Sequence, residues 1–304
     1  MRRIALLAVI ATVTGCASML DEDGALAVVP YRISSVGQIV VDARLNDDGP
    51  FSFAIDTGAS ITVVFDETRQ AAGIEALTSS RVSIQGLVAS GQFPLVSVKR
   101  LWVGEEGWAD ARMASIPGDS VALGSIDGIL GVDFLSRYSV GLSTANKALR
   151  LYPPELTSER AYLGWTSIPL HSLQIPDSKA TAYTIDLVIG PETIPALFDL
   201  GATTNVMNWR AARALEVRPL QPKQRNSVAG ALQSAPIKAE ININLVKTQN
   251  IHWRNRTFLI ADFPVFEVLD TGGQPMAIVG TDLFGGRDLI IDFARNRVLV
   301  KMSQ

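Results

Sequence analysis

The chain contains one short pattern twice, and this duplication is the feature that most constrains its fold. The segment FAIDTGAS, at positions 53–60, is an apolar run that ends in Asp56, a small polar residue and glycine. The segment ALFDLGATTN, at positions 196–205, repeats the pattern with Asp199 in the equivalent place. One Asp-x-Gly after an apolar run is a common turn. Two copies in one chain call for an explanation that covers both.

Further landmarks follow each copy in the same order. The segment SIQGLVASG around Gly86 corresponds to SVAGALQSA around Gly230. The segment DGILGVDFL corresponds to MAIVGTDLF, which matches Gly131 with Gly280. These glycines follow their aspartates at nearly constant spacing, which unrelated turns do not produce. The sequence therefore predicts a tandem duplication.

The two halves, residues 27–152 and 166–304, both have the pattern of β structure. Short runs of β-branched or alternating apolar residues are bounded by Gly, Pro, Asn and Asp, which is typical of hairpins. A short helix is expected after each Asp motif, with Asp66 and Asn208 as N-caps. The polar segment 153–165, which contains two prolines, is predicted to be the linker. We therefore expect an all-β fold with a few short helices.

Composition and charge exclude several classes of function. The 304 residues carry a formal net charge of -3, from 27 basic and 30 acidic side chains, without a basic stripe, so nucleic acid is not an expected partner. His171 and His252 lie far apart and outside any metal-ligand spacing, which argues against a zinc site or a His-based triad. We expect no metal and no organic cofactor, and we interpret both histidines as surface or packing residues.

The N-terminus has the form of an export signal. Two arginines precede an apolar stretch at positions 4–13 that is too short to span a bilayer, and small residues follow. Residues 1–16 end in VTGC, which resembles the lipobox of bacterial lipoproteins, so Cys16 is the predicted lipidation site. It is the only cysteine, which excludes an intrachain disulfide. An ordinary secretory signal with a chance cysteine is the alternative, and the mature protein is exported in either case.

The residues after the cysteine bear on the membrane that holds the anchor. Ala17 and Ser18 stand where an aspartate would resemble an inner-membrane retention signal. The expected location is therefore the periplasmic side of the bacterial cell envelope, with the outer membrane favoured.

The duplicated motifs resemble those of the retropepsin-like and pepsin-like aspartic proteases. In these proteins an apolar strand ends in Asp-Thr-Gly, a glycine-tipped hairpin follows, and an apolar-apolar-Gly segment precedes a short helix. The chain resembles a bacterial single-chain form with two retropepsin-like acid-protease lobes related by a pseudo-two-fold axis. The resemblance covers residues 27 to 304.

This resemblance implies that Asp56 and Asp199 are the catalytic residues. Two carboxyl groups brought together at a pseudo-two-fold axis share one proton, so the charged group can activate a water while the protonated group donates to the scissile carbonyl. The loop residues expected to support this pair are Thr57, Gly58, Ser60, Gly201 and Thr203.

The resemblance also implies how a substrate would bind. Gly86 and Gly230 would lie at the tips of two flaps that close over an extended peptide or protein segment. Because both aspartates lie in one chain, a monomer should be sufficient for activity.

One departure from the family pattern leaves two functions open. The family has Thr or Ser after each Asp, with a hydroxyl that bonds across to the other loop, and Leu200 stands there in the second motif. The first interpretation is a lipid-anchored aspartic endopeptidase that cleaves a periplasmic or envelope protein. The alternative is a noncatalytic envelope lipoprotein that binds extended peptides in the same cleft.

Overall fold

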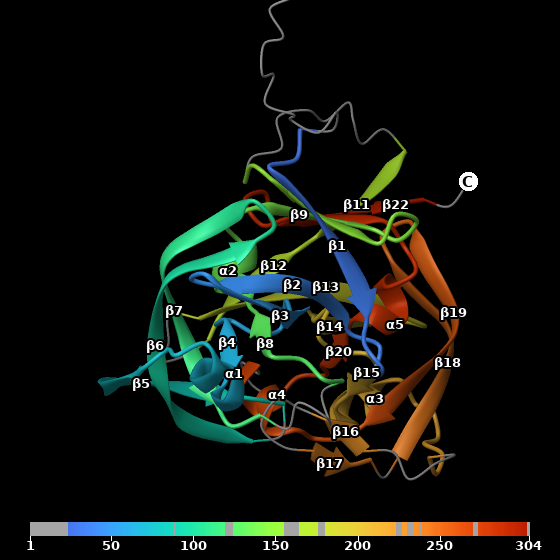
Figure 1. Ribbon diagram of the computed structural model, residues 1–304. Helices are drawn as coiled ribbons and strands as arrows, with labels where there is room; N and C mark the ends of the chain where they lie inside the picture. The colour runs from blue at the N-terminus through green and yellow to red at the C-terminus, as the bar shows by residue number, and fades with distance from the viewer. Residues whose placement is uncertain are drawn as a thin grey trace, which may run out of the picture.

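The protein is built mainly from β-strands, in two lobes that repeat one arrangement (Figure 1). The computed structural model describes residues 24–302 except positions 88, 119–123, 155–163, 176–179, 223–226, 230–233, 238 and 270–272. These residues form 22 strands and five short helices, so the predicted all-β class is confirmed. Two predicted functional positions, Cys16 and Gly230, lie outside the described residues.

The N-terminal lobe begins with a three-strand meander and continues through a long hairpin. Its elements in chain order are β1 (Ala27–Ile33), β2 (Ile39–Leu45), β3 (Asp48–Ile55), β4 (Val63–Phe65), α1 (Asp66–Ala71), β5 (Ala76–Gln85), β6 (Ser90–Val103), β7 (Glu106–Ile116), β8 (Gly128–Leu130), α2 (Val132–Leu135), β9 (Ser139–Ser143) and β10 (Ala148–Tyr152).

The C-terminal lobe repeats this order with small differences. Its elements are β11 (Trp165–Pro169), β12 (His171–Gln174), β13 (Thr181–Ile189), β14 (Glu192–Phe198), β15 (Asn205–Met207), α3 (Trp209–Ala214), β16 (Ser227–Ala229), β17 (Ser234–Pro236), β18 (Ala239–Thr248), β19 (Ile251–Ile260), α4 (Pro264–Leu269), β20 (Ala277–Val279), α5 (Thr281–Phe284), β21 (Leu289–Asp292) and β22 (Arg297–Lys301). The helix α4 has no counterpart in the first lobe, which has one strand, β1, where the second has β11 and β12, and the short ribbon β16–β17 stands where the first lobe has the hairpin β5–β6.

Strand pairing shows that the two lobes are copies of one design. In the first lobe, β8 lies between β3, which is parallel to it, and β4, which is antiparallel. In the second lobe, β20 lies between β14, which is parallel to it, and β15, which is antiparallel. The parallel pair β4–β7 corresponds to β15–β19, and the hairpin β6–β7 corresponds to β18–β19. The duplicated sequence pattern therefore produces a duplicated topology.

One continuous sheet joins the lobes on the side opposite the ribbon β16–β17 (Figure 1). Its strand order is β11-β22-β21-β9-β10-β1, and the connection is the antiparallel pair β9–β21, which aligns Leu142 with Leu289 and Ser139 with Asp292. The largest apolar cluster contains buried residues of both lobes. A shared sheet and a shared core hold the lobes in one fixed relation.

A carboxylate also ties the lobes together at this sheet. Asp288, before β21, accepts hydrogen bonds from the backbone N–H and the hydroxyl of Thr144, after β9, at 2.7 and 2.8 Å. Burial by itself raises the pKa of Asp288, but the two Thr144 hydrogen bonds and nearby Lys301 outweigh burial, so the pKa lies below its ordinary value. The contact therefore favours the ionised carboxylate.

Asp288→Asn is expected to lower the free energy of unfolding by about 1 kcal/mol at neutral pH, because a hydrogen bond to a charged group is replaced by a weaker neutral one. A depressed pKa stabilises the fold above the unfolded-state pKa, and the contribution disappears as pH falls through the folded pKa. Thermal unfolding of both proteins between acid and neutral pH tests this. A difference in thermal midpoint between wild type and Asp288→Asn that widens toward acid pH would contradict this prediction.

The helix starts show one confirmed N-cap and one wrong one. The Asn208 side chain accepts a hydrogen bond from the backbone N–H of Ala211 at 2.8 Å, so it caps α3 as predicted. The cap of α1 is Phe65, and Asp66 is the first helical residue instead. The Asp66 carboxylate accepts a hydrogen bond from the Ser115 hydroxyl of β7, and no side chain makes a cap hydrogen bond at the start of α1.

Both histidines lie at the surface of the protein. His171 and His252 are both exposed, as expected, and His171 lies 3.3 Å from the Asp186 carboxylate. Within the described ranges, no helix has the length and apolar character needed to cross a membrane. In the same part of the chain, no three His, Cys, Asp or Glu side chains are grouped so that they could hold a metal ion.

Candidate active site

Asp56 and Asp199 each follow the central buried strand of a lobe. β3 ends at Ile55 and β14 ends at Phe198, and both of these side chains are fully buried. The backbone N–H of Asp56 donates to Leu130 of β8 at 3.1 Å, and that of Asp199 donates to Val279 of β20 at 2.9 Å. Each aspartate is therefore fixed at its backbone by a neighbouring strand.

Each carboxylate is held by the loop that follows it. Asp56 Oδ1 accepts the backbone N–H groups of Gly58 and Ala59, both at 2.8 Å. Asp199 Oδ1 accepts those of Gly201 and Ala202 at 2.8 and 3.1 Å. The two loops therefore orient their carboxyl groups in the same way.

The structure brings the two carboxyl groups together at the junction of the lobes, where they are hydrogen-bonded to each other. A Cβ atom built on Gly58 would lie 2.5 Å from Cγ of Asp199, and one built on Gly201 would lie 2.5 Å from Cγ of Asp56. Any side chain at either position would collide with the opposite carboxyl group. The glycine of each motif is thus required by the aspartate of the other motif.

The electrostatics of the pair are unequal. Burial raises the pKa of Asp56, while the hydrogen bonds from Ala59, Asp199 and Gly58 favour its charged form and oppose that rise. Burial, the adjacent charge of Asp56 and the shared hydrogen bond all raise the pKa of Asp199, which lies well above its ordinary value. The two carboxyl groups therefore share one proton, and the titration belongs to the pair and not to either aspartate.

Thr57 connects the two loops across the junction. Its hydroxyl donates to the backbone carbonyl of Phe198 at 2.7 Å and accepts from the backbone N–H of Leu200 at 2.9 Å. Thr57 is only 1% exposed, so both hydrogen bonds are shielded from water. This side chain fixes the second loop from the first lobe.

Leu200, the residue that departs from the family pattern, cannot return these bonds. Its side chain is fully buried and belongs to the main apolar cluster. The cross-loop connection is therefore made by a hydroxyl on one side and by apolar packing on the other.

The comparisons with known proteins agree with this geometry. A family model described as aspartyl protease matches residues 41–134 and, a second time, residues 185–283. Together the two matches cover more than half of the chain. The chain belongs to the aspartyl protease family. A search of curated proteins finds no match.

Each half of this aspartyl protease supports its loop with the later glycine segment. The backbone N–H of Val132 donates to Ala59 at 2.8 Å, and that of Thr281 donates to Ala202 at 2.9 Å. A Cβ atom on Gly131 would lie 2.6 Å from the backbone of Ile61, so the segment packs directly beneath the loop. The repeated Gly131 and Gly280 thus brace the two aspartate loops.

Ser60 and Thr203 make no hydrogen bond to either aspartate among the described residues. Both are partly buried and lie in the aspartate loops. The Thr203 methyl group lies beside Gly37, in the turn between β1 and β2, where an added Cβ would be 3.5 Å from it. Their support of the pair stays a prediction.

The two predicted flaps differ in what can be described. Gly86 lies in the turn between β5 and β6, and its N–H donates to Ala89 at 2.8 Å, so it sits at a hairpin tip. On the other side, β16 and β17 pair antiparallel on either side of the predicted tip, Gly230, which is outside the described residues.

A contact of the first hairpin with the opposite lobe was not anticipated from the sequence. Leu87, next to Gly86, packs against a buried cluster of the C-terminal lobe that includes Phe266 and Leu269 of α4. Helix α4 also contacts β5 directly. Neither residue type nor spacing marks Leu87 in the sequence, because the contact depends on how the lobes face each other.

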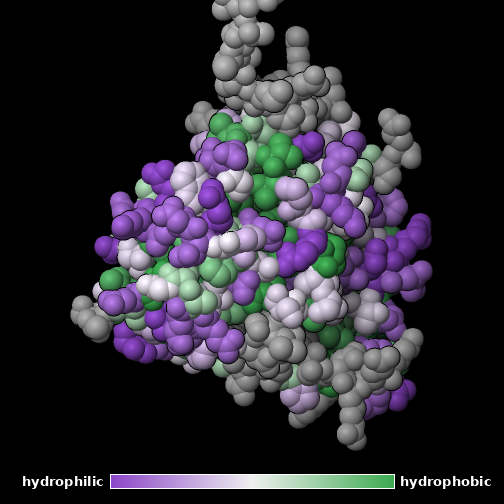
Figure 2. Space-filling model, viewed as in Figure 1, coloured by the Kyte–Doolittle hydropathy of each residue, from purple (hydrophilic) through white to green (hydrophobic). Residues whose placement is uncertain are grey.

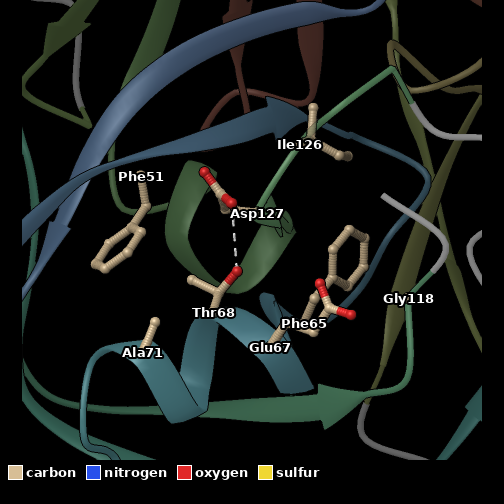
Figure 3. Close-up of a pocket in the computed structure, with 8 residues that line it drawn as sticks. All are labelled: Phe51, Phe65, Glu67, Thr68, Ala71, Gly118, Ile126 and Asp127. Atoms are coloured by element: carbon tan, nitrogen blue, oxygen red, sulfur yellow. Dashed lines mark hydrogen bonds between the residues drawn. The ribbon is translucent and has the colours of Figure 1, made fainter. Parts of the chain in front are cut away.

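Two cavities of the protease lie apart from the aspartate pair. The first, of about 190 Å³, opens beside α1, next to β3 and the segment that precedes β8. Figure 3 shows Phe51 and Phe65 with the Asp127 carboxyl group, which lies near the Thr68 hydroxyl. The second, of about 440 Å³, lies between the β1–β2 turn and α5. Neither is lined by Asp56 or Asp199.

Proposed function

We propose that this protein is an exported, lipid-anchored aspartic endopeptidase that hydrolyses peptide bonds of a protein or peptide in the bacterial envelope. Asp56 and Asp199 are its catalytic residues. The single observation that carries the proposal is the hydrogen-bonded carboxyl pair at the junction of the lobes, with each carboxyl group held by two backbone N–H groups. A pair that shares one proton can supply a base and an acid together.

The shared proton lets the pair act as base and acid in one reaction. The charged carboxyl group of the pair takes a proton from the attacking water, and the protonated group donates its proton to the oxygen of the scissile carbonyl. The carbon–nitrogen bond of the tetrahedral intermediate then breaks. The carboxyl group that took the water proton gives it to the leaving nitrogen, and a hydroxyl of the intermediate returns a proton to the other carboxylate, so the pair again shares one proton. No metal ion or organic cofactor takes part in these steps.

The substrate is an extended peptide segment. The tip of the hairpin β5–β6 packs on the opposite lobe through Leu87, which supports its role as a flap over a peptide that pairs its backbone with strand edges. Both aspartates belong to one chain, so the monomer is the active form.

Cleavage of an unfolded protein by the purified wild type, followed from acid to neutral pH, tests this function. Activity should appear while the pair holds one proton and should fall as pH rises past the raised pKa of Asp199. If the protein binds peptide but cleaves none at any pH, the result would contradict the endopeptidase proposal and favour a noncatalytic peptide-binding lipoprotein.

The lipid anchor has a separate test. Full-length protein is expected to partition with membranes, because acylation of Cys16 would attach it to the bilayer. Cys16→Ser should leave the precursor unprocessed or release the protein. Cell fractionation and mass spectrometry of the N-terminus measure both effects. A wholly soluble wild type with an intact thiol would refute the anchor without touching the protease assignment.

A further inference from the structure

Another carboxyl group binds the loop that follows Asp56. This loop is inside the molecule, below the largely hydrophilic surface that Figure 2 shows. Asp133 is the second residue of α2, and Thr62 is the last residue of the loop before β4. The Asp133 Oδ1 atom accepts the Thr62 hydroxyl at 2.6 Å and the Thr62 backbone N–H at 2.9 Å, and Oδ2 lies 3.0 Å from the same nitrogen. One carboxyl group therefore binds both polar donors of Thr62.

Thr62 is fully buried, and each of its polar groups has a partner. Its hydroxyl donates to Asp133 and also accepts the backbone N–H of Gly131 at 3.2 Å. Its carbonyl accepts the backbone N–H of Ala114 on β7 at 3.0 Å. The end of the aspartate loop is therefore fixed by α2, by the glycine before α2 and by a strand of the same lobe.

The Asp133 carboxyl group in turn depends on these hydrogen bonds. Burial raises its pKa above the ordinary value, although the hydrogen bonds from Thr62 and from the backbone of Phe134 oppose that rise. The Phe134 N–H lies 2.8 Å from Oδ1. A buried carboxyl group that loses a donor is costly, so the loop or the helix would have to move to satisfy it. The position of the loop is thus coupled to the Thr62 hydroxyl.

The second lobe holds its aspartate loop differently at the matching positions. By its spacing from the aspartate, Asn205 is the counterpart of Thr62, and by its spacing from the glycine, Asp282 is the counterpart of Asp133. The Asn205 amide donates to the Asp282 carboxylate, which is exposed and also lies 3.8 Å from the Arg256 guanidinium. Among the residues that the structure describes, Asp282 accepts no backbone N–H of this loop. The grip on both the side chain and the backbone is found in the first lobe.

The second aspartate loop is instead held from the opposite lobe. The Thr57 hydroxyl binds the Phe198 carbonyl and the Leu200 N–H, on either side of the second aspartate. Thr57 and Thr62 lie in one loop of the first lobe, between β3 and β4. A shift of this loop would therefore move the N–H donors of the first carboxyl group and, through Thr57, the backbone that carries the second.

We propose that Asp133 is a positioning residue of the protease, which acts through Thr62 to keep both aspartates in place for proton transfer. It reaches the reacting groups only through the loop between β3 and β4. The proposal rests on the proposed function for its effect on cleavage. Its effect on the titration of the aspartate pair needs no substrate, so the two can be tested apart.

The first test compares Thr62→Val with Thr62→Ser in the cleavage of one unfolded substrate. Valine keeps the shape of threonine without the hydroxyl, so kcat should fall about tenfold while KM stays within about threefold of wild type, because misplaced catalytic groups slow the chemical step. Serine keeps the hydroxyl and should hold kcat within about threefold of wild type. A wild-type kcat in Thr62→Val, or an equal loss in both variants, would overturn the proposal.

Thr144→Val is the matched control for the loss of the hydroxyl. Thr144 binds Asp288 with its hydroxyl and its backbone N–H, as Thr62 binds Asp133, but at the sheet that joins the lobes. This variant should lose stability and keep kcat within about threefold of wild type. The two valine variants are compared at a temperature where both are fully folded. An equal fall in kcat in both would mean that Thr62 acts only through general stability, which would overturn the proposal.

Asp133→Asn tests the carboxyl group itself, and it decides the matter if Thr62→Val does not fold. The Thr62 nitrogen lies 2.9 and 3.0 Å from the two Asp133 oxygens, so either orientation of an asparagine places its NH₂ group beside this donor. The kcat of this variant should fall at least about threefold. A kcat equal to that of wild type would overturn the proposal.

The titration of the aspartate pair gives a test that does not depend on cleavage. The hydrogen bonds from Gly58 and Ala59 favour the charged form of Asp56. If Thr62→Val loosens the loop, these bonds weaken, and the pair should lose its first proton about half a pH unit higher than in wild type, whereas Thr144→Val should leave the titration unchanged. Carbon-13 NMR of labelled aspartate carboxyl groups measures this, with Asp56→Asn to assign the signals. An unchanged titration in Thr62→Val would overturn the proposal. A wild type that cleaves no peptide, with the shift present in the variant, would contradict only the proposed function.

Discussion

Replacing either aspartate of the pair by asparagine is expected to lower peptide cleavage by at least about 10³-fold, and the double variant should lose no more than either single one. Asparagine can neither take a proton from water nor carry the acidic proton, so a pair with one asparagine lacks part of the acid–base function. Because the two groups act on one bound substrate as a unit, the first substitution already abolishes their joint contribution, and the second substitution causes no further loss of activity. Initial rates on one unfolded substrate measure all four proteins.

The stability of these variants should change in the opposite direction from their activity. The raised pKa of Asp199 means that the folded protein binds its proton more tightly than the unfolded chain does. Stability therefore falls as pH rises from the unfolded pKa toward the folded one. Asp199→Asn removes this penalty, so its thermal midpoint should exceed that of wild type near neutral pH and converge with it in acid.

Asp127→Asn is the matched control for these substitutions. Asp127 is a partly buried aspartate of the first lobe, and its carboxylate accepts the backbone N–H of Ser52 at 2.7 Å. The same chemical change there should leave cleavage within severalfold of wild type. Undiminished cleavage in Asp56→Asn or Asp199→Asn, or an equal loss in Asp127→Asn, would sink the dyad mechanism.

The aspartate loops could be predicted from sequence because their geometry demands particular residues. Gly58 and Gly201 each face the opposite carboxyl group at a distance that excludes any Cβ atom. The same residue is therefore required in both halves of the sequence. The duplicated order of motifs then implies the duplicated topology. The parts of the site in which backbone atoms and carboxyl groups are in close contact can therefore be predicted from local sequence.

Features that depend on how the lobes meet could not be predicted in this way. Pairing of β9 with β21 is one case, because edge strands present similar backbone groups whatever their side chains. The contact of Leu87 with the opposite lobe is another, since an apolar residue in a hairpin turn has many equivalent partners until the lobes are placed. Asp66 shows the same limit locally, because the Ser115 hydroxyl that donates to its carboxylate lies on a strand far along the chain.

Leu200→Thr, which restores the family's residue, is expected to destabilise the protein by about 2–4 kcal/mol. Leu200 is fully buried in the main apolar cluster, so the smaller side chain leaves a cavity and brings a hydroxyl into apolar surroundings. Leu200→Val separates these two costs, because valine matches threonine in shape without the hydroxyl. Chemical denaturation of the three proteins gives both differences in the free energy of unfolding.

If the hydroxyl instead finds an acceptor across the junction, as the Thr57 hydroxyl finds the Phe198 carbonyl, the threonine variant will be more stable than the valine variant. That result would mean that the second half of the cross-loop connection can still form, and that leucine replaced a usable bond with packing. A threonine variant less stable than the valine variant would mean that the junction has been rebuilt around an apolar side chain.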